Sequence, residues 1–162
     1  MNKLAIAISG LFLAIGAQAA ENPTNGFFIG AQTGTLHIHD EPSATVSGIK
    51  GGYRYYFNDK FSGEVEASIL HANTSESDKL RSVSFGVAYD LPLNDNFTFR
   101  PKVALGSFQS SFNSGSSQGA MSKVGFELAY KKNFSVELGF DHYKSGSNAG
   151  AYSTNVGLNY KF

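Results

Sequence analysis

The segment Phe134–Tyr143 reads Phe-Ser-Val-Glu-Leu-Gly-Phe-Asp-His-Tyr, with an apolar side chain at every second position of its first seven residues. Serine, glutamate, glycine and aspartate occupy the positions between and just after them. Because successive side chains of a strand point to opposite faces, this pattern predicts a strand with one apolar face and one charged face. A segment of this length also suffices to cross a bilayer as a tilted strand.

Seven further segments of the chain alternate in the same way. We predict strands over Phe27–Leu36, Val46–Phe57, Phe61–Leu70, Ser82–Leu91, Phe97–Phe108, Ala120–Tyr130, Phe134–Tyr143 and Tyr152–Phe162. Short turns alternate with longer polar connections over 37–45, 71–81, 109–119 and 144–151, and the Ser/Gly-rich stretch 110–119 is typical of a flexible loop tip. This layout predicts an all-β, eight-stranded, antiparallel up-and-down transmembrane barrel, with both termini on the short-turn, periplasmic side.

The first residues have the features of a targeting signal. Lys3 precedes an apolar run over 4–16, and Ala17-Gln18-Ala19 is a small-x-small cleavage site. We predict a cleaved signal peptide over 1–19 and a barrel over 20–162. The apolar run is too short to span a bilayer as a helix, and no later run is longer. A membrane location therefore requires a closed barrel, since only helices and barrels satisfy their backbone groups in lipid.

Composition excludes several functions. The 162 residues carry 13 basic and 13 acidic side chains and no cysteine. Zero formal charge without a basic cluster argues against nucleic acid as a partner, and the missing cysteine rules out disulfides and thiolate chemistry. His37 and His39 stand two residues apart in the first predicted long loop and His71 begins the second, which suggests a cation or pH-sensing site, but such loops are usually just solvated. We expect no metal and no cofactor.

The two faces of the predicted strands decide what surrounds the barrel. The face that carries the aromatic residues has no charge, whereas the opposite face has six cations and six anions. A soluble exported barrel would place the charges outside, but it has no reason to balance them; a sealed polar lumen does. We therefore predict a lumen charge network of Lys50, Arg54, Glu64, Glu66, Asp90, Arg100, Lys102, Lys123, Glu127, Glu137, Asp141 and Lys161.

Three details of the barrel follow from this assignment. Glu64 and Glu66 face the cations of the second and fifth strands, so we expect them at the centre of the network. Pro101 lies inside a strand, where its missing N–H predicts a bulge or a local break. The aromatic residues predict one girdle near the short turns. They predict a weaker second girdle at the opposite end of the barrel, formed by Phe108, Phe140, Tyr143 and Tyr152.

Several motifs resemble those of the small eight-stranded outer-membrane proteins, the OmpA-barrel and OmpX/Ail group. They are Gly26–Ala31, Gly51–Arg54, Phe85–Tyr89 with Asn94-Asp95, and Val156–Phe162. The resemblance implies that Tyr160 and Phe162 form the signal read by the barrel assembly machinery, a transient partner. The chain ends at Phe162, so we expect no peptidoglycan-binding domain like the one that follows the OmpA barrel.

A second resemblance points to an enzyme. His142-Tyr143 followed by Ser147–Gly150 is similar to a stretch of PagL-type lipid A deacylases, which need a Ser–His pair oriented by an acid. Lys144 stands where the serine would lie, and the last strand has no acid. We therefore expect no enzymatic activity.

The sequence thus predicts a monomeric, non-enzymatic barrel in the outer membrane of a Gram-negative bacterium, with a structural or surface-interaction role and no identified host ligand. It contacts outer-membrane lipid and lipopolysaccharide, whose phosphates Lys79 and Arg81 could pair with. The alternatives are a minor channel for small solutes or ions, a PagL-like deacylase and an exported soluble barrel.

Overall fold

The computed structural model describes residues 25–38, 43–73, 78–112, 115–131, 133–146 and 150–162, so the predicted signal peptide lies outside the described part. Its strands are β1 (Gly26–Ile38), β2 (Ala44–Tyr56), β3 (Phe61–Ala72), β4 (Lys79–Tyr89), β5 (Leu91–Pro92), β6 (Phe97–Phe112), β7 (Gly115–Tyr130), β8 (Phe134–Lys144) and β9 (Ala151–Lys161). None of the residues described forms a helix long and apolar enough to cross a membrane.

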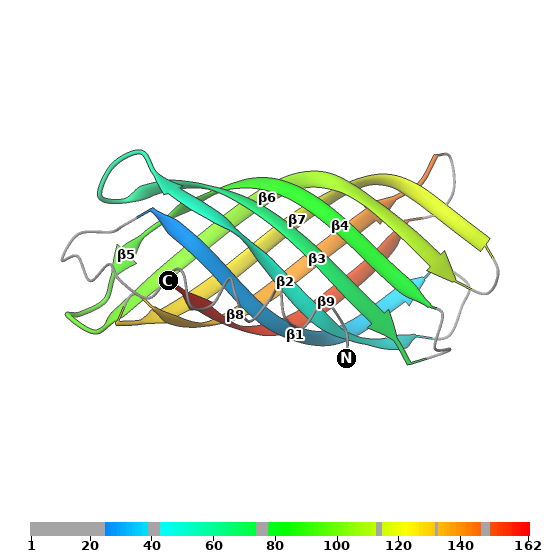
Figure 1. Ribbon diagram of the computed structural model, residues 1–162, viewed down its shortest axis with the longest axis horizontal. Helices are drawn as coiled ribbons and strands as arrows, with labels where there is room; N and C mark the ends of the chain where they lie inside the picture. Colours follow the sequence, from blue (N-terminus) through cyan, green and yellow to red (C-terminus); the bar gives the residue numbers. More distant parts are fainter. Residues whose placement is uncertain (1–24, 39–42, 74–77, 113–114, 132, 147–149) are drawn as a thin grey trace, which may run out of the picture.

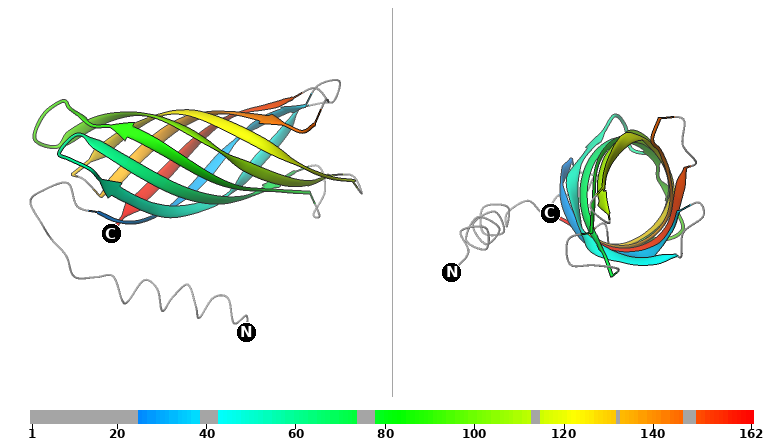
Figure 2. Two further views of the ribbon diagram at one scale, coloured as in Figure 1. Left: turned by 90° about the horizontal axis from the view of Figure 1, so that it is seen from above. Right: turned by 90° about the vertical axis from the view of Figure 1, so that its right-hand side faces the viewer.

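The strands close into a barrel. Neighbouring strands pair antiparallel, β1 pairs with β9, and β4 pairs with β6 across the remaining gap. The two-residue β5 continues β4 beyond Asp90. Counting β4 and β5 as one, the described strands form the eight wall strands, or staves, around one axis (Figures 1 and 2). The predicted all-β, eight-stranded antiparallel barrel is therefore confirmed. Below, the terminus end is the end with Gly26 and Phe162, and the loop end is the opposite one.

The hairpin of β6 and β7 extends farther than predicted. Residues 109–119 were expected to form a long loop, but Gln109 pairs with Gln118 and Ser111 pairs with Ser116. Only 113 and 114, at the tip, lie outside the described residues of this hairpin. The loop prediction is wrong because polar residues occupy both faces of the ribbon, which removes the apolar alternation while the backbone pairing continues.

Pro101 coincides with a break in pairing but not with a bulge. Its pairing with Phe126 on β7 is uninterrupted. On the other side, Ala88 pairs with Lys102 and Leu91 pairs with Phe99 in a single continuous register, with Asp90 unassigned between them. The Asp90 N–H donates to the Lys60 carbonyl on the β3 side at 2.7 Å, so only the pairing with β6 is interrupted and the register does not slip.

The outward face forms an apolar belt. None of the larger apolar side chains that alternation assigns to this face is buried, and Phe85, Leu105 and Leu158 are each more than 60% exposed. At the terminus end, aromatic rings pair between neighbouring strands or two residues apart along one chain segment, with centroids 4.7–5.5 Å apart: Phe27–Tyr53, Tyr55–Phe57, Phe61–Tyr89, Phe97–Tyr130, Phe134–Tyr160 and Tyr160–Phe162. The predicted girdle at this end is present.

One glycine of the inner face is required by close packing. A Cβ at Gly52 would lie 2.0 Å from the Val65 carbonyl oxygen and 2.7 Å from the Phe28 ring. Phe28 on β1 pairs with Gly52 on β2, and its ring lies over that glycine. The Arg54 guanidinium carbon is 5.7 Å from the centroid of the Phe28 ring. The glycine therefore gives space to an aromatic ring as well as to charged side chains.

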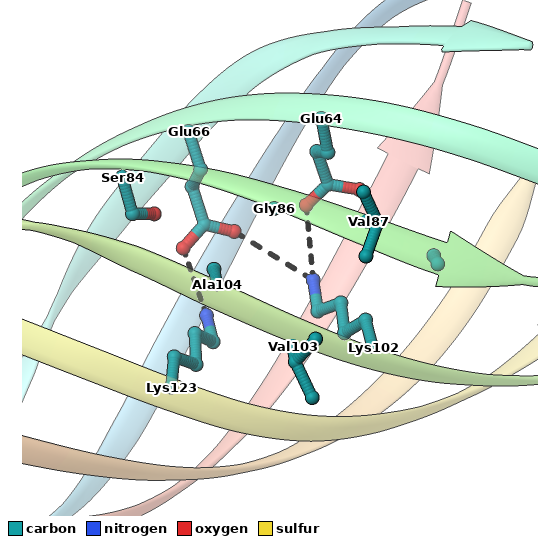
Figure 3. A pocket seen from close by; sticks show the side chains of 10 residues that line it. Glu64, Glu66, Ser84, Gly86, Val87, Lys102, Val103, Ala104 and Lys123 are labelled. Carbon is teal, nitrogen blue, oxygen red and sulfur yellow. Dashed lines mark hydrogen bonds and ion pairs between the residues drawn. The ribbon is translucent and has the colours of Figure 1, made fainter.

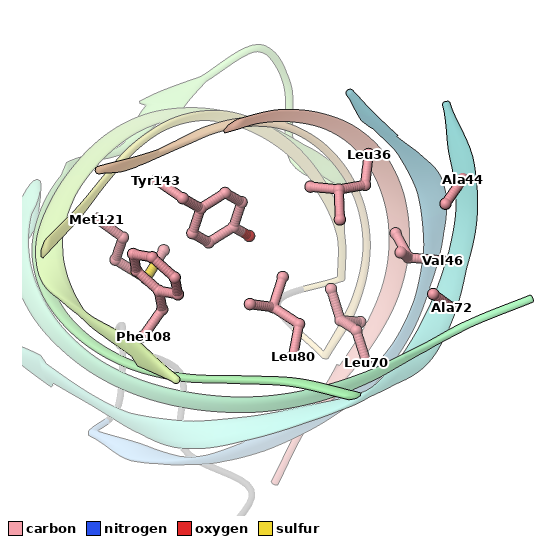
Figure 4. Close-up of a cluster of buried hydrophobic side chains, with 9 residues drawn as sticks. All are labelled: Leu36, Ala44, Val46, Leu70, Ala72, Leu80, Phe108, Met121 and Tyr143. Carbon is pink, nitrogen blue, oxygen red and sulfur yellow. The ribbon is translucent and has the colours of Figure 1, made fainter. Parts of the chain in front are cut away.

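The two faces of the wall exchange polarity toward the loop end. The outward positions that follow the belt are polar, among them Thr33 on β1, Ser47 on β2 and Arg81 on β4. The inward positions become apolar at the same end and form a hydrophobic cluster inside the barrel (Figure 4), which we call the lumen cap: Leu36, Ala44, Val46, Leu70, Ala72, Leu80, Phe108, Met121 and Tyr143.

The lumen cap corrects part of the predicted second girdle. Phe140 and Tyr152 are exposed on the outer wall as expected, but Phe108 and Tyr143 are buried inside the barrel, with ring centroids 5.2 Å apart. Both lie at positions whose alternation points inward. The aromatic character of these two residues was therefore a poorer guide than their phase along the strand.

Candidate functional site: the lumen

The interior between the lumen cap and the terminus end is filled with charged side chains. All twelve side chains assigned by alternation to the inner face are buried: Lys50, Arg54, Glu64, Glu66, Asp90, Arg100, Lys102, Lys123, Glu127, Glu137, Asp141 and Lys161. They come from β2, β3, β6, β7, β8, β9 and the gap between β4 and β5. Because residues far apart in sequence meet here, the alternation predicted which way each side chain points but not its partner.

Glu137 on β8 is the centre of the largest cluster. Its carboxylate contacts Lys50, lies 2.9 Å from the Lys102 Nζ and 3.0 Å from the Lys123 Nζ, and is only 1% exposed. The Asn159 amide also donates to it at 3.1 Å. Three lysines on β2, β6 and β7 therefore converge on one carboxylate that the sequence did not single out from the other acids.

Glu66 and Glu64 on β3 complete this cluster (Figure 3). Glu66 lies 3.2 Å from Lys50, 2.8 Å from Lys123 and 3.8 Å from Lys102. Glu64 accepts from Lys102 at 3.0 Å. Both glutamates contact cations of the second and fifth predicted strands, which are β2 and β6, as we expected. They share the centre of the network with Glu137.

A second cluster lies toward the terminus end and is built on two arginines. Arg54 donates to Glu64 at 2.6 Å and to Glu127 at 2.8 Å. Arg100 donates to Glu127 at 2.7 Å and forms a two-pronged contact with Asp90 at 2.5 and 2.7 Å. Such bidentate pairs fix geometry as well as charge. Because Glu64 contacts both Lys102 and Arg54, it joins the two clusters into one stack.

Polar groups finish the stack at both ends. Next to the lumen cap, one Asp141 oxygen accepts from the Tyr143 hydroxyl at 3.1 Å, from Ser153 at 3.3 Å and from the Asn155 amide at 2.9 Å. At the terminus end, the Lys161 ammonium lies 5.2 Å from the centre of the Tyr56 ring. The Tyr143 ring thus belongs to the lumen cap while its hydroxyl belongs to the polar stack.

The cavity between the central charged side chains of the stack is very small. A cavity among Glu64, Glu66, Ser84, Lys102 and Lys123 measures about 10 Å³, which is about the minimum for one water molecule. Each lysine and arginine of the two clusters has carboxylate partners, so the charges compensate one another where they are removed from bulk water. Chemically, this arrangement is suited to holding the staves together and not to binding a solute.

The histidines are not gathered into one site in the described residues. The His142 ring lies against Tyr152 on the outer wall, with centroids 4.7 Å apart. His37 shares a hydrogen bond with the Ser43 hydroxyl at 2.7 Å, whereas 39–41 lie outside the described residues. No group of three or more His, Cys, Asp or Glu side chains that could hold a metal ion occurs in the described part.

A closed wall with an apolar outer belt and a charged interior defines an integral membrane barrel. The chain belongs to the outer membrane protein beta-barrel domain family, whose model matches residues 5–162. No curated protein sequence matches the chain significantly.

Solved barrels share the fold at low sequence identity. Ail of Yersinia pestis, crystallised with the heparin analogue sucrose octasulfate, is 18% identical, with a TM-score of 0.58 over 85% of this chain and 97% of that one. The outer membrane enzyme PagL is 16% identical, with a TM-score of 0.64 over 83% and 99%. Neisserial surface protein A is 15% identical, with a TM-score of 0.57 over 85% and 97%. These similarities show the shared barrel fold, and the family match confirms the predicted group of outer-membrane barrels.

Proposed function

We propose that this protein is a non-enzymatic, non-conducting structural and surface barrel of the outer membrane. The observation that supports it is the filled lumen: an ionic stack joins β2, β3, β6, β7 and β8, and the lumen cap lies above it. Eight-stranded barrels leave an interior that side chains can fill, and here they do so with compensating charges. A filled interior stabilises the wall but gives no continuous path for a solute, which argues against the minor channel.

Planar-bilayer recording tests the proposal directly. We expect the purified barrel to give no frequent, large and stable openings at the holding potentials that open general porins. A general porin incorporated in the same bilayers is the positive control. Regular openings of constant size from the unmodified chain would contradict a sealed lumen and support the minor channel.

The proposed orientation has the termini and short turns in the periplasm and the β6–β7 hairpin outside. The chain contains no cysteine, so single-cysteine variants report position without background. Ser116 in the hairpin and Asp59 in the β2–β3 turn are both exposed. We expect Ser116→Cys to react with a membrane-impermeant maleimide on intact cells, and Asp59→Cys only after the outer membrane is permeabilised. The reverse pattern would invert the orientation.

We further propose that Tyr160 and Phe162 are the signal read by the barrel assembly machinery and that the barrel is a monomer. The two rings pack edge to face, with centroids 5.0 Å apart, and the Phe162 N–H donates to the Phe27 carbonyl at the seam between β1 and β9. Replacing Phe162 with Ala should lower the amount of barrel in the outer membrane. Unchanged assembly of Phe162→Ala in cells would contradict the signal role.

The likeness to PagL raises a deacylase as a second candidate, and the local geometry argues against it. His142 is followed two residues later by Lys144, and β9 contains no acid to orient a histidine. The nucleophile, base and acid of such chemistry must lie within hydrogen-bond reach of one another. We expect lipid A acylation in cells to be the same for the unmodified chain and for His142→Ala.

Outer-membrane lipid, including lipopolysaccharide, is the partner we propose for the outer wall. The apolar belt supports contact with acyl chains, and polar groups begin at the loop end of each stave. Ail was crystallised with a sulfated saccharide analogue, which adds support for contact with an anionic saccharide at this kind of surface.

A further inference from the structure

We infer that the outer wall of β4, β6 and β7 carries a headgroup site for a phosphorylated glycolipid of the outer leaflet. This inference rests on the proposed function and assigns its lipid contact to particular residues. The site, which we call the rim hollow, is a depression of about 620 Å³ at the loop end, lined by Arg81, Ser107, Gln109, Gln118 and their neighbours.

Strand register brings the polar groups of the rim hollow into one row. Arg81 on β4 pairs with Gln109 on β6, which pairs with Gln118 on β7. All three side chains are exposed on the outer face. Directly opposed side chains of neighbouring strands are about 5 Å apart, so a guanidinium and two carboxamides line up across three strands. Ser107, one position below Gln109 on the same face, is small and leaves the space open.

The charge of this surface suits an anion. Lys79 lies one outward position above Arg81, opposite Ser111 on β6. Among the described residues, no carboxylate forms an ion pair with Arg81 or Lys79, whereas every arginine and lysine of the two lumen clusters has carboxylate partners. A guanidinium that no described carboxylate pairs with can form a bidentate, charge-assisted contact with a phosphate, and carboxamides can both donate to and accept from sugar hydroxyls.

The height of the rim hollow selects a lipid as the source of that phosphate. Val83 and Leu105 are exposed and mark the last apolar positions of the belt on β4 and β6. Arg81 and Ser107 are the next outward positions on the same strands. An outer wall that changes from apolar to polar at this point meets the boundary between acyl chains and headgroups. A phosphorylated headgroup whose chains lie on the belt would therefore place its phosphate beside Arg81.

Native mass spectrometry of the folded barrel tests the site. The probes are lipid A with two phosphates, monophosphoryl lipid A and phosphatidylcholine, each added to the same detergent-solubilised barrel. We expect a preference for lipid A with two phosphates, and Arg81→Gln should weaken its binding by about tenfold. The matched control is Lys60→Gln, an exposed cation in the β2–β3 turn at the terminus end, which should leave binding unchanged.

Further arms separate the explanations. Arg81→Lys should recover only part of the affinity, because lysine keeps the charge but not the fork. Heat-dependent gel mobility confirms that each variant is folded. Equal loss in Arg81→Gln and Lys60→Gln would overturn the site, as would no preference for lipid A, or full displacement of lipid A by the same concentration of inorganic phosphate. In each of these cases, planar-bilayer recordings without openings would still support the proposed non-conducting barrel. Failure of the lipid site and failure of the proposed function are therefore distinguishable.

Discussion

Replacing Glu137 with glutamine tests whether the ionic stack carries the stability of the barrel. The substitution keeps the shape of the side chain and removes the charge that three lysines share. Breaking a buried ion pair by removing one partner costs about 3–5 kcal/mol, because the remaining charge is left uncompensated. Here each lysine keeps another carboxylate: Lys50 and Lys123 contact Glu66, and Lys102 contacts Glu64. We therefore expect the lower end, about 3 kcal/mol.

The assay is guanidinium unfolding of the barrel refolded in detergent micelles, with the folded fraction measured by gel mobility without boiling. Asp59→Asn, an exposed acid in the β2–β3 turn, is the matched control and should stay within about 0.5 kcal/mol of the unmodified chain. Adding Lys50→Met to Glu137→Gln removes one of the three lysine charges that then exceed the remaining carboxylate charge, and it should recover part of the lost unfolding free energy. A loss below about 0.5 kcal/mol for Glu137→Gln would refute the reasoning, since it would mean that water solvates these charges individually.

Three further predictions concern the lumen cap and the inner face. Leu36→Ala, inside the cap, should cost about 2–5 kcal/mol of unfolding free energy, whereas Leu158→Ala on the outer belt leaves no internal cavity and should cost less; guanidinium titration compares them. Gly52→Ala should destabilise by about 1–3 kcal/mol because its methyl group meets a carbonyl oxygen and an aromatic ring, and equal midpoints would contradict this packing. Replacing Phe108 and Tyr143 together with alanine should leave planar bilayers silent, because the ionic stack still fills the lumen beneath the cap; regular openings from that variant would show that the cap alone seals the lumen.

Alternation was sufficient to predict the fold because a closed barrel imposes two environments on each strand. Glu137 and Phe140 illustrate this: one inward and charged, the other outward and aromatic, in the same short segment. The number of staves, their order and the outward belt follow from repeating that pattern, since neighbouring strands joined by short turns pair with each other. The central role of Glu137 does not follow, because its lysines come from three other strands and their distances depend on stagger around the barrel.

The errors share one physical cause, which is that the surroundings of the wall change along each strand. Leu36 and Phe108 point inward, and at their height the outer wall is polar, so the barrel there follows the rule of a soluble protein with an apolar inside. A prediction that assumes one environment for a whole strand assigned two such inward residues, Phe108 and Tyr143, to a lipid-facing girdle. The position where polarity exchanges, between Val83 and Arg81 on β4, is visible in the sequence once both rules are considered.

The lumen cap makes the two ends of the barrel interior different, because the apolar cluster lies only at the loop end. A layer of hydrocarbon side chains offers neither hydrogen bonds to a relay of protons nor ligands to a hydrated ion, so traffic from the loop side stops there. Among the described residues, the cap therefore separates the buried lysines and glutamates from the loop end. In the proposed orientation, with the chain ends in the periplasm, acid or salt applied at the cell surface would therefore reach the cap before it could reach the buried charges.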